Sequence, residues 1–107
     1  MQIKGRKLKK KGTFLIVTKK PIEFLDFVRK QKCIICYRSP CDPDHLNSIG
    51  MGRDRSRPDL LEHLSCIPLC RSHHIERHAM SLSQFENKFK VNVWEENHHY
   101  LTKWLNG

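Results

Sequence analysis

The pattern of apolar and polar residues predicts a strand and a helix near the start of the chain. Residues 13–18 (TFLIVT) are β-branched and apolar, as in a strand, and residues 2–8 can pair with them through a turn at Lys11-Gly12. Pro21 suits the first turn of a helix that ends near Gln31. Its wide apolar face would be formed by Ile22, Phe24, Leu25, Phe27 and Val28. We expect this strand and helix to make the core.

The pattern changes in the middle of the chain and becomes helical again towards the end. Residues 33–57 hold two prolines and two glycines among polar residues, which favours loops and short strands. A second apolar run, residues 64–69, leads into residues 71–80, which contain no Gly or Pro and favour a helix. Ser81 or Ser83 can cap a further helix that carries Leu82, Phe85 and Phe89.

A capping box predicts the last helix, because Asn92 is followed by Glu95 three residues later. The expected apolar face of this helix consists of Val93, Trp94, Tyr100, Leu101, Trp104 and Leu105. The fold class expected from these elements is α+β.

Length and composition limit the class of protein. A chain of 107 residues with 38% hydrophobic residues predicts one small domain, and a core of this size commonly needs help from a metal or a partner. No apolar run approaches the roughly 20 residues that span a bilayer, and residues 14–17 are too short for a secretory signal. We therefore expect an intracellular protein without a membrane partner. Five cysteines are an odd number, which favours free thiols or metal ligands over disulfides.

The net positive charge of the chain comes entirely from its N-terminal part. Residues 1–32 hold eleven Lys or Arg against Glu23 and Asp26, whereas residues 33–107 hold nine of each sign. This segment, with Lys9, Lys10 and Lys11 in its middle, predicts an arm that binds a polyanion and that loses affinity as salt is added. A solubilising tail and a nuclear localisation signal fit the same residues.

Two short motifs predict a zinc site. Cys33 and Cys36 form a C-x-x-C pair, and Cys70 and His73 form a C-x-x-H pair thirty-four residues later. Each pair lets two side chains converge, and three thiolates with one imidazole suit a tetrahedral structural zinc. Cys41 lies near enough in sequence to replace one ligand, and a redox role for the first pair is the other interpretation. Cys66 is expected to be a buried thiol.

A histidine-rich cluster predicts a second metal site. Neighbouring helix residues point about 100° apart whereas positions i and i+4 share a face, so His73 can face the zinc while His74 and His78 face elsewhere together. Asp44 offers an oxygen ligand suited to Mg²⁺ or Mn²⁺, which leaves His45 unligated as a general base. The alternative is that His74 and His78 are exposed helix residues and that Asp44 only forms a turn.

The loop between these motifs is rich in glycine and arginine. Two glycines let the backbone approach a phosphate, and three alternate arginines offer forked donors to it. The predicted nucleic-acid contacts of the loop are Arg53, Arg55 and Arg57. A flexible solvated loop is the alternative.

The order of these motifs resembles the HNH nucleases with a ββα-metal site. The resemblance rests on C-x-x-C, Asp44-His45-Leu46, the basic loop and PLCRSHHIERH at residues 68–78. More narrowly, IGMGRDRSRPD, HLSCIPLCRSHHIERHAMS and QFE within residues 48–86 are similar to a bacteriophage and prophage group of HNH nucleases. The similarity covers roughly residues 33–90 and leaves the basic N-terminal segment outside.

The resemblance implies a role for each matching residue. His45 would activate water, and Asp44 and His74 would ligate a divalent ion, Mg²⁺ or Mn²⁺ with Ni²⁺ or Zn²⁺ as further options. His78 would join them if the chain follows the histidine-rich version of the site. His73 stands where a Cys is more usual in the zinc set. The usual middle Asn, five residues before Cys70, is Ser65 here, and His63 is the better candidate for that position.

The sequence thus predicts a small zinc-stabilised ββα-metal domain that cuts DNA. We expect a single domain over residues 1–107, with a basic hairpin and helix at 1–32, the zinc-stabilised core at 33–80 and C-terminal helices at 81–107. A phage-encoded endonuclease in the cytoplasm of a bacterial host is implied, and double-strand cutting would favour a homodimer. The rival hypotheses are an inactive zinc-stabilised nucleic-acid-binding module of a recombination or packaging complex, and a structural protein of a phage particle.

Overall fold

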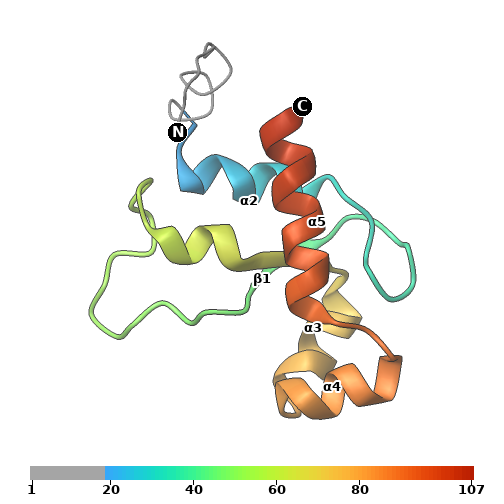
Figure 1. Cartoon of the computed structure of the whole chain (residues 1–107). Helices are drawn as coiled ribbons and strands as arrows, with labels where there is room; N and C mark the ends of the chain where they lie inside the picture. Colours follow the sequence, from blue (N-terminus) through green and yellow to red (C-terminus); the bar gives the residue numbers. More distant parts are fainter. Residues whose placement is uncertain (1–18) are drawn as a thin grey trace, which may run out of the picture.

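The computed structural model describes residues 19–107, so the predicted hairpin and the Lys9–Lys11 run lie outside the described residues. The described part is α+β, as predicted (Figure 1). Its elements are, in chain order, α2 (Pro21–Arg29), β1 (Asp42–His45), the 3₁₀ helix η1 (Leu61–Ser65), β2 (Cys66–Leu69), α3 (Arg71–His78), α4 (Leu82–Phe89) and α5 (Val93–Asn106).

The two strands form one antiparallel ribbon. Asp42 lies opposite Leu69 and His45 lies opposite Cys66. Successive strand residues point to opposite faces, so Asp42 and Asp44 share one face of the ribbon. β2 is buried along its whole length, whereas β1 is mostly polar. The polar strand thereby places the carboxylate of Asp44 in the interior of the protein.

The outer edge of β2 is covered by two donors from other parts of the chain. The backbone N–H of Ile34 donates to the carbonyl of Pro68 at 3.1 Å. The side-chain amide of Asn97, on α5, donates to the carbonyls of Leu64 and Cys66 at 2.8 and 2.9 Å. Edge strands expose unpaired backbone groups, and here an amide side chain satisfies them.

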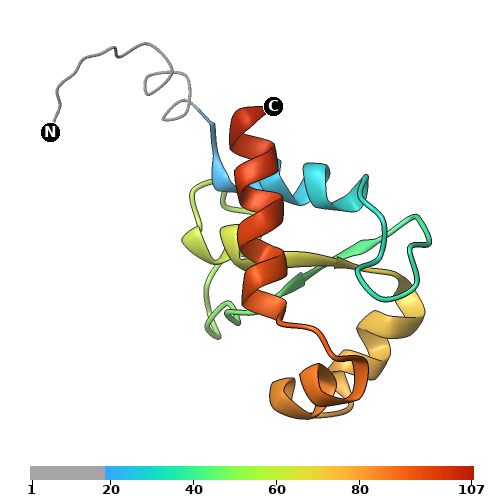
Figure 2. The ribbon, with the colours of Figure 1, turned by 45° about the vertical axis from the view of Figure 1, so that its right-hand side comes forward.

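Two apolar clusters lie along the ribbon. α5 packs across β2, as Figure 2 shows, and α2 packs against β2, η1 and α5. The first cluster joins the strands to α4 and the start of α5 through Cys33, Ile34, Cys41, Ile67, Leu69, Cys70, Phe85 and Val93. The second joins α2 to Cys66 and the end of α5 through Phe24, Leu25, Val28, Tyr100, Leu101 and Trp104.

The helix starts agree with the sequence signals, but the N-cap and the buried face of α5 differ from what the sequence predicts. Pro21 begins α2, and Ser81 caps α4 in a capping box with Gln84. At α5 the side chain of Asn92 accepts the N–H of Glu95 at 3.1 Å, but the structure records only this half of the predicted box. Trp94 was expected on the buried face and is 44% exposed. Asn97 is buried instead, because its amide serves the edge of β2.

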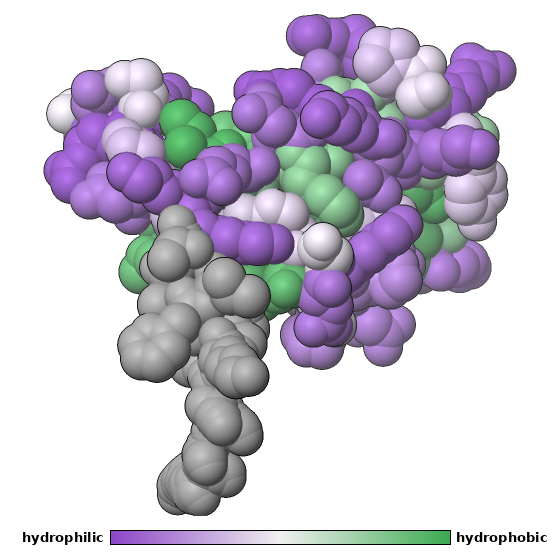
Figure 3. Space-filling model, turned by 90° about the horizontal axis from the view of Figure 1, so that it is seen from above, coloured by the Kyte–Doolittle hydropathy of each residue, from purple (hydrophilic) through white to green (hydrophobic). Residues whose placement is uncertain are grey.

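The surface of the described part is mainly polar. From above, hydrophilic side chains cover most of the visible face and apolar ones show in small areas between them (Figure 3). Within residues 19–107, no helix combines the length and the apolar character needed to cross a membrane.

Candidate metal centres

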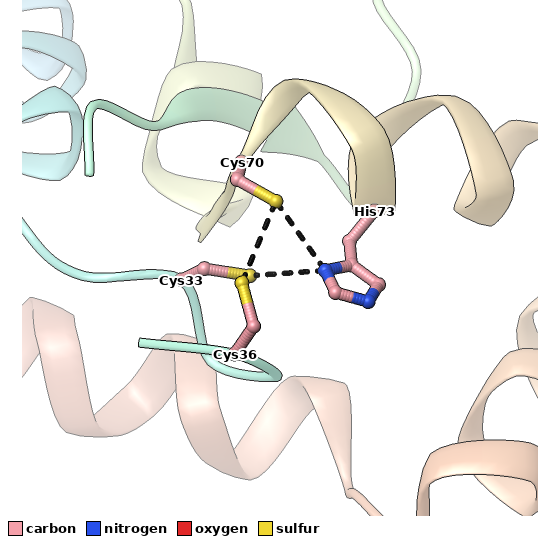
Figure 4. Close-up of side chains that lie close together, drawn as sticks. All are labelled: Cys33, Cys36, Cys70 and His73. Atoms are coloured by element: carbon pink, nitrogen blue, oxygen red, sulfur yellow. Dashed lines mark hydrogen bonds between the residues drawn. The ribbon is translucent and has the colours of Figure 1, made fainter. Parts of the chain in front are cut away.

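The first candidate metal centre joins the two cysteine motifs. Cys33, Cys36, Cys70 and His73 converge from the loop after α2 and from the start of α3 (Figure 4). The Cys36 and Cys70 sulfurs are 3.7 Å apart. Nδ1 of His73 lies 3.7 Å from the Cys33 sulfur and 3.3 Å from the Cys70 sulfur. The structure thus brings together the four side chains that the spacing predicted.

Local backbone geometry aims these side chains. The N–H of Cys33 donates to the carbonyl of Arg38, and the N–H of Tyr37 donates to that of Cys33, both at 2.9 Å, which folds the loop into a tight knuckle. Cys70 is the N-cap of α3, so His73 follows within the first helical turn. The ring of Phe89 meets the His73 ring edge-on, with 5.4 Å between the ring centroids.

The distances fit a tetrahedral zinc. Ligands at normal zinc bond lengths lie about 3.8 Å apart for two sulfurs and about 3.6 Å apart for a sulfur and a nitrogen. The observed separations of 3.3 to 3.7 Å match this arrangement. Burial raises the pKa of the Cys33 thiol, but backbone N–H groups of Cys70, Cys36 and Ile35 outweigh it, so the pKa is lowered. A lowered pKa favours the thiolate that binds metal.

The other two cysteines stand outside this cluster. The Cys41 thiol donates to the carbonyl of Arg38 at 3.4 Å, and burial, together with nearby Cys33, raises its pKa to about 12. The thiol of Cys41, the alternative ligand, therefore has a backbone carbonyl as its own hydrogen-bond acceptor outside the cluster. Cys66 is fully buried and burial raises its pKa, as expected of an inert thiol.

The second candidate centre lies on the other face of the same helix. Nε2 of His78 is 2.9 Å from Oδ1 of Asp44, and Nε2 of His74 is 3.4 Å from the same oxygen. The two Nε2 atoms are 3.2 Å apart. Adjacent ligands of an octahedral Mg²⁺ or Mn²⁺ are about 3.0 Å apart, so this triangle has the size of one octahedral face. The helical spacing therefore separates His73 from His74 as predicted.

The burial of Asp44 supports this assignment. Its side chain is 0% exposed, and neither carboxylate oxygen has a hydrogen-bond partner among the described residues. The guanidinium of Arg77 forms an ion pair with Asp44, with Nε 3.1 Å from Oδ2, but this Nε also has no hydrogen-bond partner among the described residues. A buried carboxylate without hydrogen bonds is costly, and a bound cation would compensate it. The donor set thus fits a divalent ion.

Asp42 supports the second centre and was not singled out from the sequence. Its Oδ2 lies 3.0 Å from Nδ1 of His74 and 3.1 Å from Nε of Arg71. With Nδ1–H donating to this carboxylate, the lone pair of His74 is on Nε2, the atom that faces Asp44. Metal-bound histidines commonly have such a carboxylate behind them. The spacing Asp42-x-Asp44 on one strand was the available signal.

His45 and His63 form a pair beside the second centre. Nε2 of His45 is 3.0 Å from Nδ1 of His63, and Nε2 of His63 is 3.1 Å from the carbonyl oxygen of Arg57. His63 is 1% exposed, whereas His45 is partly exposed. Burial lowers the pKa of His45, and the neighbouring His63 lowers it further. A neutral imidazole, which can accept a proton, is therefore favoured near pH 7.

Ser65 and His63 make different contacts near His45. The Ser65 hydroxyl accepts the backbone N–H of Asn47 at 3.0 Å and donates to the carbonyl of Glu62 at 2.7 Å. Ser65 therefore holds the backbone that follows β1, while His63 contacts the His45 ring. Both candidates for the middle position act on the same segment, one on backbone and one on a side chain.

The three loop arginines are not equivalent. Arg53 forms an ion pair with Glu62, and Arg57 binds Asp59 through two bonds of 2.8 and 3.1 Å. Arg55 has no ion pair among residues 19–107 and lines a pocket of about 380 Å³. The other residues that line this pocket are Pro43, Asp44, His45, Ser48, Ile49, His74 and His78. The pocket thus brings a candidate metal triad, a candidate base and one arginine together.

A comparison with protein families identifies a match over most of the chain. The family model described as "Putative HNHc nuclease" matches residues 9–107. Neither a curated protein nor a solved structure gave a significant match.

Proposed function

Because this chain belongs to the HNHc nuclease family, we propose that it is a metal-dependent DNA endonuclease with His45 as its general base. Membership in the family implies nuclease activity, a nucleic acid substrate and a divalent metal ion. The observation that carries the finer proposal is the pocket that joins Asp44, His45, Arg55, His74 and His78. A module that only binds phosphates would not need a buried carboxylate beside two histidines.

Each residue of the site has its own role in the proposed reaction. His45 takes a proton from water, whose oxygen then attacks the phosphorus while the bond from phosphorus to the 3′ oxygen breaks. The 3′ oxygen takes a proton from solvent. Asp44 and His74, with His78, would hold the divalent ion, Mg²⁺ or Mn²⁺, which when bound neutralises charge on the phosphate and on the leaving oxygen. Cys33, Cys36, Cys70 and His73 would hold a zinc ion that serves the fold alone.

We propose that the protein acts on DNA in a bacterial cell and that its gene comes from a phage or prophage. The basic segment with Lys9, Lys10 and Lys11 would add affinity without sequence preference. A protein that cuts both strands of a duplex would act as a symmetric homodimer.

Metal-dependent cleavage of plasmid DNA is the direct test. We expect nicking or linearisation with Mg²⁺ or Mn²⁺ and none with EDTA. The reason is that Asp44, His74 and His78 would hold the ion that neutralises charge on the phosphate. The same preparation should bind DNA in EDTA, measured by fluorescence anisotropy. Binding without cleavage under Mg²⁺, Mn²⁺, Ni²⁺ and Zn²⁺ would favour the inactive binding module over the nuclease.

Arg55 is the loop arginine that we expect to contact the phosphate near the ion. Arg55→Ala should weaken DNA binding and reduce the slope of log Kd against log salt by about one, because one phosphate contact is lost. Arg38→Ala is the matched control, since it removes one exposed charge from the zinc knuckle. An Arg55→Ala protein with the parental salt slope would show that this side chain does not contact phosphate.

A further inference from the structure

A second pocket, which we call the side pocket, adjoins the pocket that holds Asp44. Its volume is about 680 Å³, and it is lined by the loop between β1 and η1 and by the first residues of η1 (Figure 1). Ser48 lines both pockets. A nucleotide whose phosphate lies beside Asp44 can therefore reach the side pocket with its own base or with the base of its neighbour.

The charged groups of the side pocket cancel one another. Arg53 is paired with Glu62, and Arg57 is paired with Asp59 through two bonds of its guanidinium group. The two cations and the two carboxylates that line the pocket thus sum to zero. Sites for phosphate carry an excess of positive charge. A balanced pocket instead favours a neutral ligand that offers both hydrogen-bond donors and acceptors.

The uncharged side chains of the side pocket complete its chemistry. Leu60 and Leu61 both line it, and Leu61 is 73% exposed. Asn47 is also exposed, and its backbone N–H is held by the Ser65 hydroxyl, whereas its side-chain amide has no hydrogen bond within residues 19–107. An amide can donate and accept at once, as the edge of a nucleobase requires. Apolar side chains suit the flat face of a base.

We propose that the side pocket binds the nucleobase next to the scissile phosphate and that the amide of Asn47 contacts the edge of this base. This proposal rests on the proposed function and adds a specificity site to it. A nucleobase is neutral, has a flat apolar face and carries donors and acceptors on its edge, so it matches all three properties of the pocket. Arg55 then contacts the phosphate, while the two paired arginines of the same loop line the site for the base.

Two other kinds of ligand fit the side pocket less well. A phosphate would have to compete with Asp59 and Glu62 for the two arginines. A metal ion would have to compete with the arginines for the same carboxylates, and neither carboxylate belongs to a metal-ligand cluster in the described part of the chain. A neutral base can enter without breaking either ion pair.

Free deoxynucleosides test the class of ligand without any cleavage. The wild-type holoprotein, labelled with ¹⁵N and with ¹³C in its methyl groups, is titrated with each deoxynucleoside of DNA and, separately, with inorganic phosphate. We expect at least one deoxynucleoside to shift the NMR signals of the Asn47 side-chain amide and the Leu61 methyl groups, and phosphate to leave them in place. Shifts with phosphate alone, or no shift with any deoxynucleoside, would overturn the proposal.

Abasic substrates test the consequence for cleavage. The cut position is mapped on a labelled duplex, and the base on each side of it is then removed in turn while the sugar and phosphate are kept. The wild type should cut one of these two abasic duplexes with a kcat/KM about tenfold lower, because a good base contact is worth at least that factor. Equal kcat/KM values on the intact duplex and both abasic duplexes would contradict a base site.

Asn47→Ala identifies the contact within the side pocket. This variant should cut the intact duplex with a kcat/KM about tenfold lower and should lose most of its sensitivity to the missing base, because the two changes remove the same interaction. The slope of log Kd against log salt should stay parental, since no phosphate contact is lost. Asn87→Ala, at an exposed position on α4, is the matched control. Parental sensitivity of Asn47→Ala to the missing base would exclude a role for this amide in recognition.

A charge-balanced double variant distinguishes a base site from a phosphate site. Arg57→Gln combined with Asp59→Asn removes one ion pair and leaves the net charge unchanged. We expect reduced sensitivity to the missing base and a parental salt slope, whereas a phosphate contact at Arg57 would make the slope smaller by about one.

The outcomes separate this proposal from the proposed function. A wild-type protein that cuts no DNA contradicts the nuclease, and the deoxynucleoside titration still decides whether the side pocket binds a base. A wild-type protein that cuts intact and abasic duplexes equally well contradicts only the base site.

Discussion

Replacing His45 with alanine should lower the single-turnover rate of DNA cleavage by about 10²–10⁴-fold, the usual contribution of a general base. The reason is that its partly exposed ring faces the pocket of Asp44, His74 and His78, and its lowered pKa favours the neutral form. Asp44, His74 and His78, the proposed ligands of the divalent ion, are unchanged in this variant, so metal binding should persist. The rate is measured on a labelled duplex with Mn²⁺ in excess.

Folding and DNA binding of the His45→Ala protein are the control measurements for its cleavage rate. We expect parental zinc content, a parental far-UV spectrum and a DNA dissociation constant within about threefold in EDTA, because His45 supplies no zinc ligand and no positive charge when neutral. His98→Ala, on the exposed side of α5, should cut at the parental rate. Parental cleavage by His45→Ala would assign the base to another group.

Local motifs made the candidate sites predictable from the sequence. C-x-x-C and C-x-x-H each bring two ligands together within a few residues, and helical spacing separates His73 from the pair His74 and His78. Local rules also place Pro21 at a helix start and Ser81 at a helix cap. These features depend on neighbours in the chain, and they agree with the structure.

Features that depend on distant parts of the chain could not be predicted in this way. The role of Asp42 requires that α3 lie over the face of β1. The ion pair of Arg53 with Glu62 leaves Arg55 as the arginine of the pocket, and a charge pattern alone treats both as equal. Asn97 is buried because an edge of β2 needs donors, whereas apolar spacing favoured Trp94.

Loss of the proposed structural zinc should unfold the domain. Zinc sites of this kind contribute roughly 10–16 kcal/mol of folding free energy, which is comparable to or larger than the 5–15 kcal/mol of a typical domain. The four ligands join the loop after α2 to the start of α3, and the first apolar cluster includes Cys33 and Cys70. Without the ion, these segments lose their connection and the cluster loses its support.

Cys33→Ser tests this expectation, and Cys41→Ser, in the same apolar cluster but outside the ligand set, is its matched control. We expect Cys33→Ser to lose zinc and its cooperative thermal transition, followed by circular dichroism, with zinc measured by mass spectrometry. Cys41→Ser should keep one zinc per chain and a cooperative transition, because Cys41 donates to the carbonyl of Arg38 and a serine hydroxyl can do the same. A strong chelator should unfold the wild type as Cys33→Ser does. If Cys33→Ser instead melted at the parental temperature without zinc, the apolar clusters alone would hold the fold and the four side chains would need another role.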